Sequence, residues 1–350
     1  MHMADSLLSV EIGTVFAVIS GTAIVMSTHK IENDKKKLPM IAVMAAFVFA
    51  AQMINFTIPG TGSSGHLGGA ILLTRVLGPP AALLAISSVL IIQAFFFADG
   101  GLIALGTNIF NMGIIPVFIV YPFFQKWIEG DKYSKKLQRT MLFLSALIAV
   151  TLGALSVVIQ TSFSGVLEIN FIHFALLMLP IHLFIGIGEG LISISVMEFI
   201  ASNAPALIIK TTNGSNNQGL KENQKSGIPK AARAMLILTL FIAAFLSWFA
   251  SSHPDGLEWS IEKSSLTLNE NSNQNTGHQE ITFADKSVDF QEKFAPLPDY
   301  AIKEGNNALT EKAGTSLSGI MGSLLVMVFL LLFIFGYKLL QKLTQRHAKS

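Results

Sequence analysis

Long apolar runs separated by short polar segments recur along this 350-residue chain. A helix needs about 20 consecutive apolar residues to cross the hydrocarbon core of a bilayer. The runs that we expect to span the membrane are residues 7–28, 39–57, 67–77, 79–97, 101–125, 140–163, 171–200, 232–250 and 317–340. The pattern predicts an all-α polytopic membrane protein, in which a seven-helix bundle is followed by a two-helix module.

The stretch 67–97 can be interpreted as one broken span or as two spans, because Pro79 and Pro80 interrupt it. The basic residues favour two spans. Four segments between or after the apolar runs hold 18 of the 24 Lys and Arg, and basic loops mark the cytoplasmic side of a membrane. All four lie inside only if the N-terminus is outside, the C-terminus is inside and residues 67–97 cross twice. We therefore expect a turn at the prolines, with Arg75 reaching the inner interface.

The polar segments predict the domain organisation. Residues 1–205 form the seven-helix unit, and residues 206–231, rich in Asn, Gly, Lys and Ser, read as a flexible cytoplasmic linker. Residues 232–345 form the two-helix module. Its polar segment 251–316 carries eleven acidic residues against five Lys and no Arg, and the topology places it outside. We expect this segment to be a loop or a small, loosely ordered domain.

The composition excludes several classes of protein. Hydrophobic residues make up 51% of the chain and charged residues 13%, well below the roughly 25% of soluble domains. There is no cysteine, so disulfides and thiolate metal sites are excluded. No G-x-x-x-x-G-K-[ST] motif occurs, so the chain cannot hydrolyse ATP as a P-loop enzyme does. The absence of H-E-x-x-H argues against a membrane metalloprotease.

The opening residues, MHMADSLLSV, carry candidate chemistry. They lack the basic region and the cleavage site of a signal peptide, so we expect them to be retained and to face outside. The amine of Met1, the backbone nitrogen of His2 and the His2 imidazole can then close two fused chelate rings on one metal ion. Such a planar nitrogen set suits Ni²⁺ and Cu²⁺. His66, the only histidine of the next outward segment, is a candidate fourth ligand; alternatively, His2 is incidental and His66 caps a helix.

Four motifs resemble the CbiM/NikM family, the substrate-binding components of energy-coupling-factor (ECF) transporters for cobalt and nickel. Residues 1–8 are similar to its Met-His opening, with Ser6 in place of the usual glycine. TGSSGHLGGAILLTRVLGPPAA resembles its second-histidine loop and proline turn, and IQAFFFADGGLIALGTNIFNMG its Asp-Gly-Gly block. HLFIGIGEGLI resembles its His-Leu-x-Ile-Gly-x-x-Glu-Gly helix. The resemblance covers residues 1–200.

A fifth motif lies in the second module. Its residues, Pro254, Asp255, Gly256, Leu257 and Glu258, resemble the PDGLE motif of the NikN-type accessory subunit, so the chain looks like a NikM–NikN fusion. His253 precedes the motif. It could pass metal towards the N-terminal site, or it could be an ordinary solvated histidine.

The resemblance implies a function and partners. It implies a non-catalytic subunit that takes up nickel or cobalt in a prokaryotic cytoplasmic membrane, with the ion as transported substrate and no cofactor. It also implies ECF ATPase subunits and a transmembrane coupling subunit as partners. Membrane lipid is the expected surrounding, and no nucleic-acid partner is expected. The ligand set that the resemblance implies is Met1, His2 and His66. The sequence leaves open nickel against cobalt, the use of the metal in a nickel enzyme or in cobalamin biosynthesis, and a stand-alone channel or secondary carrier, for which we find no convincing inverted repeat.

Other polar groups in or near the spans are candidates for supporting the metal site or for helix packing. They are Asp5, Gln93, Asp99, Asn108, Asn111, His182 and Glu189. We expect Asp99 to cap the following helix or to attract cations, and the amides to form interhelical hydrogen bonds. His182 and Glu189 share a helix face, where they could fix packing or support His2 or His66. Ala42, Ala46 and Ala50 form a small-residue stripe that we assign to contact with the coupling subunit, with packing inside the chain as the alternative.

Overall fold

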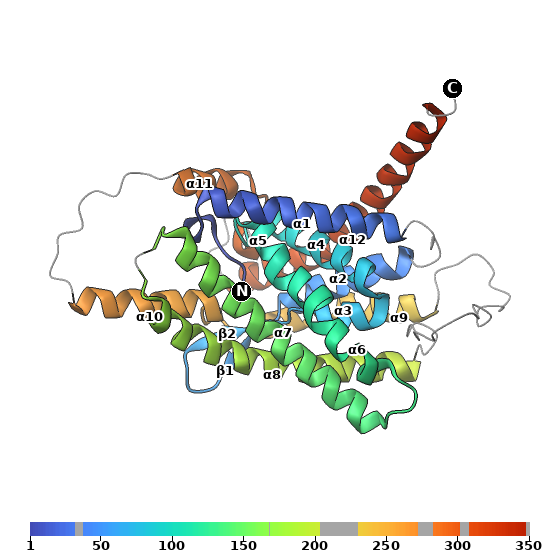
Figure 1. Cartoon of the computed structure of the whole chain (residues 1–350), viewed down its shortest axis with the longest axis horizontal. Helices are drawn as coiled ribbons and strands as arrows, with labels where there is room; N and C mark the ends of the chain where they lie inside the picture. Colours follow the sequence, from blue (N-terminus) through green and yellow to red (C-terminus); the bar gives the residue numbers. More distant parts are fainter. Residues whose placement is uncertain (32–37, 168, 204–229, 272–282, 302–307, 348–350) are drawn as a thin grey trace.

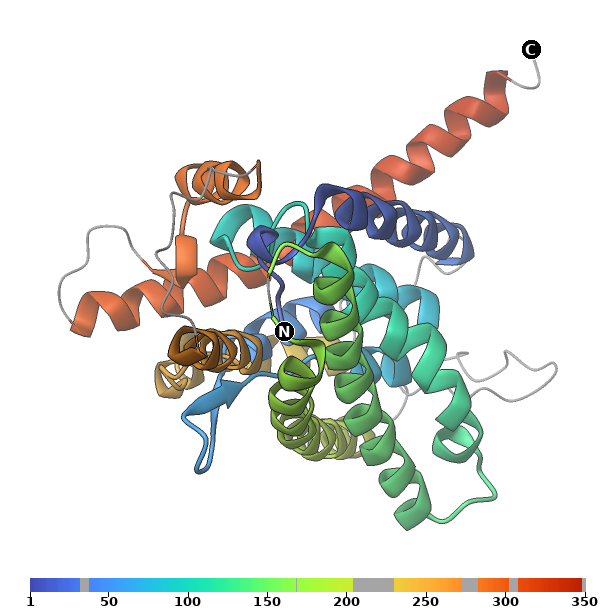
Figure 2. The ribbon, with the colours of Figure 1, turned by 60° about the vertical axis from the view of Figure 1, so that its left-hand side comes forward.

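The computed structural model describes residues 1–31, 38–167, 169–203, 230–271, 283–301 and 308–347, and it is mostly helical (Figure 1). The predicted linker 206–231 lies almost entirely outside the described residues. Helices run roughly side by side along the long axis, and the N-terminal residues lie inside the bundle rather than at its rim (Figures 1 and 2).

The first module contains a short η1 (Asp5–Leu7) and the helices that follow it in chain order. These are α1 (Val10–Ile31), α2 (Leu38–Gln52), α3 (Ala70–Leu77), α4 (Pro79–Phe97), α5 (Leu105–Ile109), the π-helical η3 (Phe110–Val120), α6 (Tyr121–Glu129), α7 (Lys135–Ser164) and α8 (Phe171–Asn203). A small antiparallel hairpin, β1 (Phe56–Ile58) and β2 (Ser63–Gly65), pairs Phe56 with Gly65 between α2 and α3.

The second module contains two apolar helices, α9 (Lys230–Ala244) and α12 (Ala308–His347). Between them lie η5 (Leu246–Phe249), α10 (Gly256–Asn271), α11 (Phe283–Phe294) and η6 (Pro298–Tyr300). The expectation of a loosely ordered segment over 251–316 is therefore wrong for the described part of that segment, which is largely helical. The Asn and Ser content of this segment suggested a loop, but α10 begins directly after Asp255.

Within the described residues, six helices are long and apolar enough to cross a membrane, which is the pattern of a multi-pass membrane protein. They comprise 10–31, 79–97, 105–129, 135–164, 171–203 and 312–337, and two shorter apolar helices cover 38–52 and 232–244. The predicted span 67–77 is wrong in length, because α3 has only eight residues, about 12 Å of helix. The turn at the prolines is confirmed: Gly78 adopts a φ of 82° and Pro79 begins α4.

The stripe of Ala42, Ala46 and Ala50 is covered by the chain itself. All three are at most 1% exposed, and α2 packs against both α9 and α12. The Ser323 hydroxyl of α12 donates to the Ala46 carbonyl at 3.4 Å. The surface that we assigned to a partner is thus occupied by the second module, so the intramolecular alternative describes the structure. The sequence of an apolar helix predicts that its small-residue face is buried, but it does not identify the helix that covers this face.

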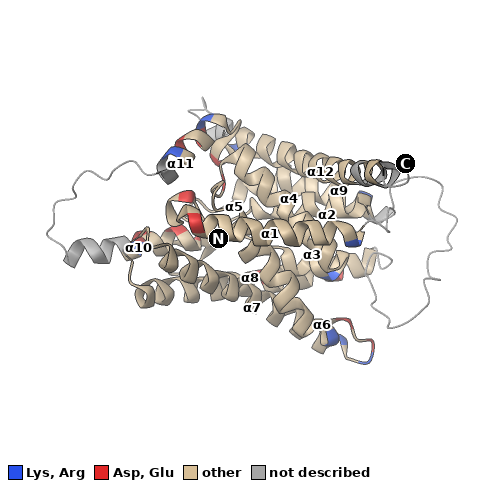
Figure 3. Cartoon of the chain, turned by 45° about the horizontal axis from the view of Figure 1, so that its top comes forward, with Lys and Arg blue, Asp and Glu red and all other residues tan. Residues whose placement is uncertain are grey.

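Charges separate along the long axis of the bundle (Figure 3). Asp and Glu gather around the N-terminus at one end, while several Lys and Arg lie at the opposite helix ends, where some Asp and Glu accompany them near α6; α11 also carries both signs (Figure 3). The acidic end contains the residues that the sequence analysis singled out.

Candidate metal centre

The N-terminal segment is an extended strand-like piece held inside the bundle. Asn108 brackets Met3: its Oδ1 accepts from the Met3 amide at 2.8 Å and its Nδ2 donates to the Met3 carbonyl at 3.1 Å. The Gly101 amide donates to the same carbonyl at 2.8 Å. Met3 is fully buried. These contacts fix the backbone two residues away from the terminal amine.

Asp5 and Asn111 complete the anchoring of this segment. Asp5 is fully buried; its Oδ1 accepts from the Ala104 amide at 3.0 Å and its Oδ2 from the Ser287 hydroxyl at 2.5 Å. The amide of Asn111 exchanges hydrogen bonds with Gln160 at 2.7 and 3.0 Å. The expected interhelical hydrogen bond is therefore present at Asn111, whereas Asn108 bonds to the extended N-terminal segment instead of to a helix.

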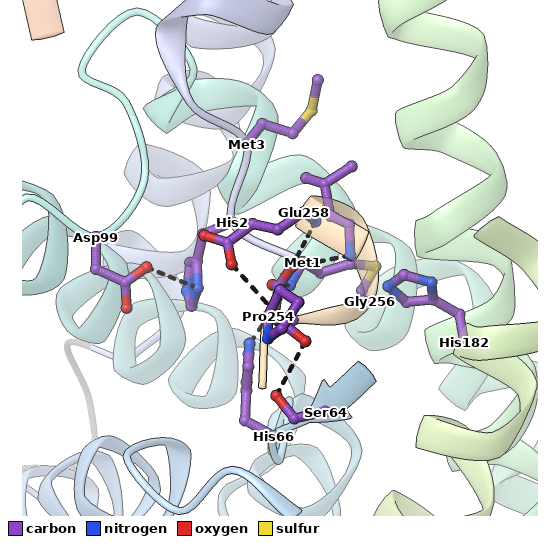
Figure 4. A network of polar contacts seen from close by, with 12 residues as sticks. Met1, His2, Met3, Ser64, His66, Asp99, His182, Pro254, Gly256 and Glu258 are labelled. Atoms are coloured by element: carbon purple, nitrogen blue, oxygen red, sulfur yellow. Dashed lines mark hydrogen bonds and ion pairs between the residues drawn. The ribbon is translucent and has the colours of Figure 1, made fainter. Parts of the chain in front are cut away.

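The terminal amine faces two groups from distant parts of the chain (Figure 4). The Met1 nitrogen lies 2.6 Å from Asp255 Oδ2 and 3.4 Å from His66 Nε2. His66 Nδ1 lies 3.1 Å from the Leu67 carbonyl, which can only accept, so Nδ1 carries the proton and Nε2 presents its lone pair. The rings of His66 and His2 stack with centroids 5.1 Å apart. The structure thus brings together Met1, His2 and His66.

His2 is turned towards a carboxylate. Its Nδ1 lies 3.1 Å from Asp99 Oδ1, and its Nε2 is buried without a hydrogen-bond partner (Figure 4). Asp99 also accepts from the Tyr300 hydroxyl at 2.6 Å. The expectation that Asp99 caps the next helix is wrong, since α5 begins after Ala104 with no side-chain cap. Asp99 instead orients His2.

The electrostatics of the site keep both imidazoles neutral. Burial lowers the pKa of His2, and it lowers the pKa of His66 to about 3, helped by the positive charge of the terminal amine. For Asp255, burial alone would raise the pKa, but the amine and its other hydrogen-bond donors hold that pKa below its usual range. Neutral imidazoles retain the lone pairs that a metal ion requires.

A second layer of contacts positions the His66 loop. The two carboxylate oxygens of Glu189 accept from the backbone amides of Gly68 and Gly69 at 2.5 and 2.8 Å. Gln52 donates to the Gly68 carbonyl at 2.9 Å and accepts from Gln93 at 2.8 Å. Gln52 was missed by the sequence analysis, because a glutamine at the end of an apolar helix gives no signal of the loop that it will meet.

His182 points into the space beside this site. Its Nδ1 lies 2.8 Å from the Met178 carbonyl of its own helix, and its Nε2 is buried without a partner. A cavity of about 20 Å³ is lined by His182, Met1, His66 and Asp255 among others. The space suffices for one water-sized group. His182 and Glu189 therefore both lie near the His66 loop, on the same face of α8.

The Pro254–Glu258 motif forms the start of α10. Its residue types match the requirements of a helix N-terminus packed against α8. Asp255 Oδ1 accepts from the amides of Leu257 and Glu258 at 2.8 and 2.9 Å, while Glu258 Oε2 accepts from the Asp255 amide at 3.3 Å, which is a capping box. At Gly256 a Cβ would lie 2.7 Å from Ile181 and 3.0 Å from His182, so no side chain fits. Leu257 packs in a cluster with Met3.

The same motif is joined to the His66 loop. The Ser64 amide donates to the Pro254 carbonyl and the Ser64 hydroxyl to the His253 carbonyl, both at 2.8 Å, and Ser64 forms a parallel bridge with Asp255. The His253 side chain itself is exposed. The spacing of Asp255 and Glu258 is the signal of a capping box, which the sequence analysis did not use. Nothing in one sequence shows that Asp255 reaches Met1.

No group of three or more His, Cys, Asp or Glu side chains suited to a metal ion occurs among the described residues. The terminal amine beside the two imidazoles adds a nitrogen that such a group of side chains does not include.

The fold and this site define a helical multi-pass membrane protein with a nitrogen-rich centre at one end. Residues 2–207, more than half of the chain, match the CbiM family, described as the cobalt uptake substrate-specific transmembrane region. The chain belongs to this family. Residues 229–339 match the PDGLE domain.

Relatives and solved structures agree with that assignment. A protein of Archaeoglobus fulgidus whose name describes a fused nickel transport protein, NikMN, is 29% identical over 93% of this chain and 96% of its own length. The "Probable fused nickel transport protein LarMN" of Lactiplantibacillus plantarum is 29% identical over 75% of this chain and 79% of its own. A crystal structure described as a truncated transition metal transporter covers 58% of this chain and 99% of its own, with 28% identity and a TM-score of 0.50.

Proposed function

We propose that the chain takes up a divalent transition-metal ion, nickel or cobalt, by binding it at the end of the bundle that holds the N-terminus. Family membership and relatives named as nickel and cobalt transport proteins support this proposal. The observation that carries it is the convergence of a terminal amine and two buried, neutral imidazoles from Met1, His2 and His66.

The proposed ligands are the Met1 amine, the His2 backbone nitrogen, His2 Nδ1 and His66 Nε2. His66 Nε2 already has its lone pair directed at the amine. His2 Nδ1 faces Asp99, and a carboxylate only accepts, so this nitrogen carries the proton there. To bind a metal, the imidazole must leave Asp99 and shift this proton to Nε2, so that the ring stays neutral and Nδ1 presents its lone pair. Four nitrogens in a plane favour Ni²⁺ over Co²⁺, because square-planar coordination is typical of Ni²⁺ and Cu²⁺.

We further propose that transport depends on ECF partners: two ATPase subunits and a membrane coupling subunit. The chain has no P-loop motif of its own with which to couple ATP hydrolysis to movement. The separation of charge in Figure 3 supports an orientation with the N-terminus outside and the C-terminus inside. In this orientation the metal site faces the side from which the ion comes.

Binding of Ni²⁺ and Co²⁺ to the purified, detergent-solubilised chain tests the proposal. We expect a planar, diamagnetic Ni²⁺ complex with visible absorption, lost in His2→Ala and in His66→Ala. His253→Ala is the matched control, because this exposed histidine lies close to the site and contributes only its carbonyl. Equal binding by all three variants would refute the ligand assignment. Nickel flux through liposomes containing the chain alone would favour the channel alternative over an ATP-driven importer.

A further inference from the structure

The second module contributes a charged group to the candidate metal centre. Asp255 Oδ2 is 2.6 Å from the Met1 amine, although 254 residues separate them, and the two side chains are only 18% and 9% exposed. Its other oxygen is used to cap α10. The carboxylate is therefore held in place by the helix start, and it does not depend on Met1 for its position.

The charge at the site is the same before and after the metal binds. A protonated amine carries one positive charge. When a divalent ion binds, the amine gives up one proton and the His2 amide another, both to solvent, so that two positive charges on the metal meet one negative charge on the amide nitrogen. One net positive charge remains in each case. A buried charge is stable only when it is paired.

We propose that Asp255 is the counter-ion of the metal centre, neutralising the protonated amine and then the bound metal complex. This inference rests on the proposed function. It means that the second module contributes a charged residue to the binding site. Asp99 is the other carboxylate facing the centre, but it is 25% exposed and is shared with the Tyr300 hydroxyl. Glu258 faces the backbone of Asp255 and does not contact the amine.

Two isosteric substitutions separate charge from structure. Asp255→Asn removes the negative charge and keeps an oxygen that can cap α10, since Asn and Asp are equally good N-caps. Glu258→Gln removes a negative charge from the same helical turn and keeps the capping-box acceptor. Asp255→Ser is a second neutral, cap-competent variant in case the asparagine chain does not fold. Nickel affinity is measured at fixed pH on the full chain in detergent, with thermal unfolding as the check on folding.

We expect Asp255→Asn or Asp255→Ser to weaken nickel binding at least about tenfold, because one member of a partly buried charge pair is lost, while Glu258→Gln stays within about twofold. Nickel affinities of the folded Asp255 variants within twofold of the unaltered chain would overturn the inference and leave the proposed function standing. An equal loss in Glu258→Gln would also overturn it, since general charge or helix capping would then explain both. If the unaltered chain does not bind nickel, the proposed function fails and this inference fails with it.

Discussion

Replacing Glu189 by glutamine tests whether the His66 loop is positioned from α8. Glu189 uses both oxygens, one on each of the amides of Gly68 and Gly69. A glutamine has only one oxygen, so one of the two amides must face an NH₂ group and lose its acceptor. These amides lie two and three residues after His66, and the loss is therefore expected to move the ligand.

The magnitude follows from the buried hydrogen bond. An unpaired buried N–H costs about 1–3 kcal/mol. If that cost falls on the metal-competent loop conformation, nickel affinity drops by roughly 5- to 150-fold. The assay is a nickel titration of the purified chain, with thermal unfolding measured beside it to separate local misplacement from global loss of structure.

Glu198→Gln is the matched control. Glu198 lies on the same helix, but its side chain is exposed and pairs with Arg139 at 2.6 Å on the surface. Surface pairs contribute about 0–1 kcal/mol, so this variant should bind nickel like the unaltered chain. Equal affinities for Glu189→Gln and Glu198→Gln would show that the loop holds its position without Glu189, and the reasoning above would be wrong.

Two further predictions concern the terminal amine. Adding two alanines before Met1 moves the amine out of both the chelate and the contact with Asp255, so nickel binding should fall at least about a hundredfold. A single added residue is avoided, because it would make the histidine the third residue, where a new amine, two backbone nitrogens and the imidazole can themselves form a planar site. Binding is measured by titration against the same chain with an extended C-terminus, and unchanged binding would exclude the amine as a ligand. Lowering the pH from 8 to 6 should weaken nickel binding by about tenfold per pH unit for each proton that the metal displaces. The lowered pKa of His66, about 3, keeps this imidazole neutral throughout that range, so His66 adds nothing to the pH dependence. A flat profile from pH 8 to 6 would contradict the chelate.

The sequence predicted the helical class, the turn at Pro79 and the approach of His2 and His66, because apolar length, proline chemistry and charge distribution are local properties. It predicted α3 as a full span, since the apolar run continues through Leu67 into a loop whose shape is set by Glu189 and Gln52. The hydrogen bonds of Glu189 and Gln52 depend on which distant helices face the loop, and a single sequence does not show that.

The second module shows the same limit. Its polar composition suggested weak order, yet a capping box at Asp255 starts a helix whose first leucine, Leu257, belongs to the same buried apolar cluster as Met3. The alanine stripe of α2 was correctly read as a close-packing face. Its partner was assigned wrongly, because small residues fit a helix of the same chain as well as a helix of another protein.

The tether between the modules has a consequence for assembly. Residues 1–203 and the helix that begins at Gly256 belong to one polypeptide, so each candidate metal centre is made together with its own copy of Asp255. Covalent linkage makes the docking of the second module an intramolecular event, which does not depend on the concentration of a separate subunit. Two separate proteins could be made in unequal amounts, and some sites would then lack Asp255. A single polypeptide excludes that outcome.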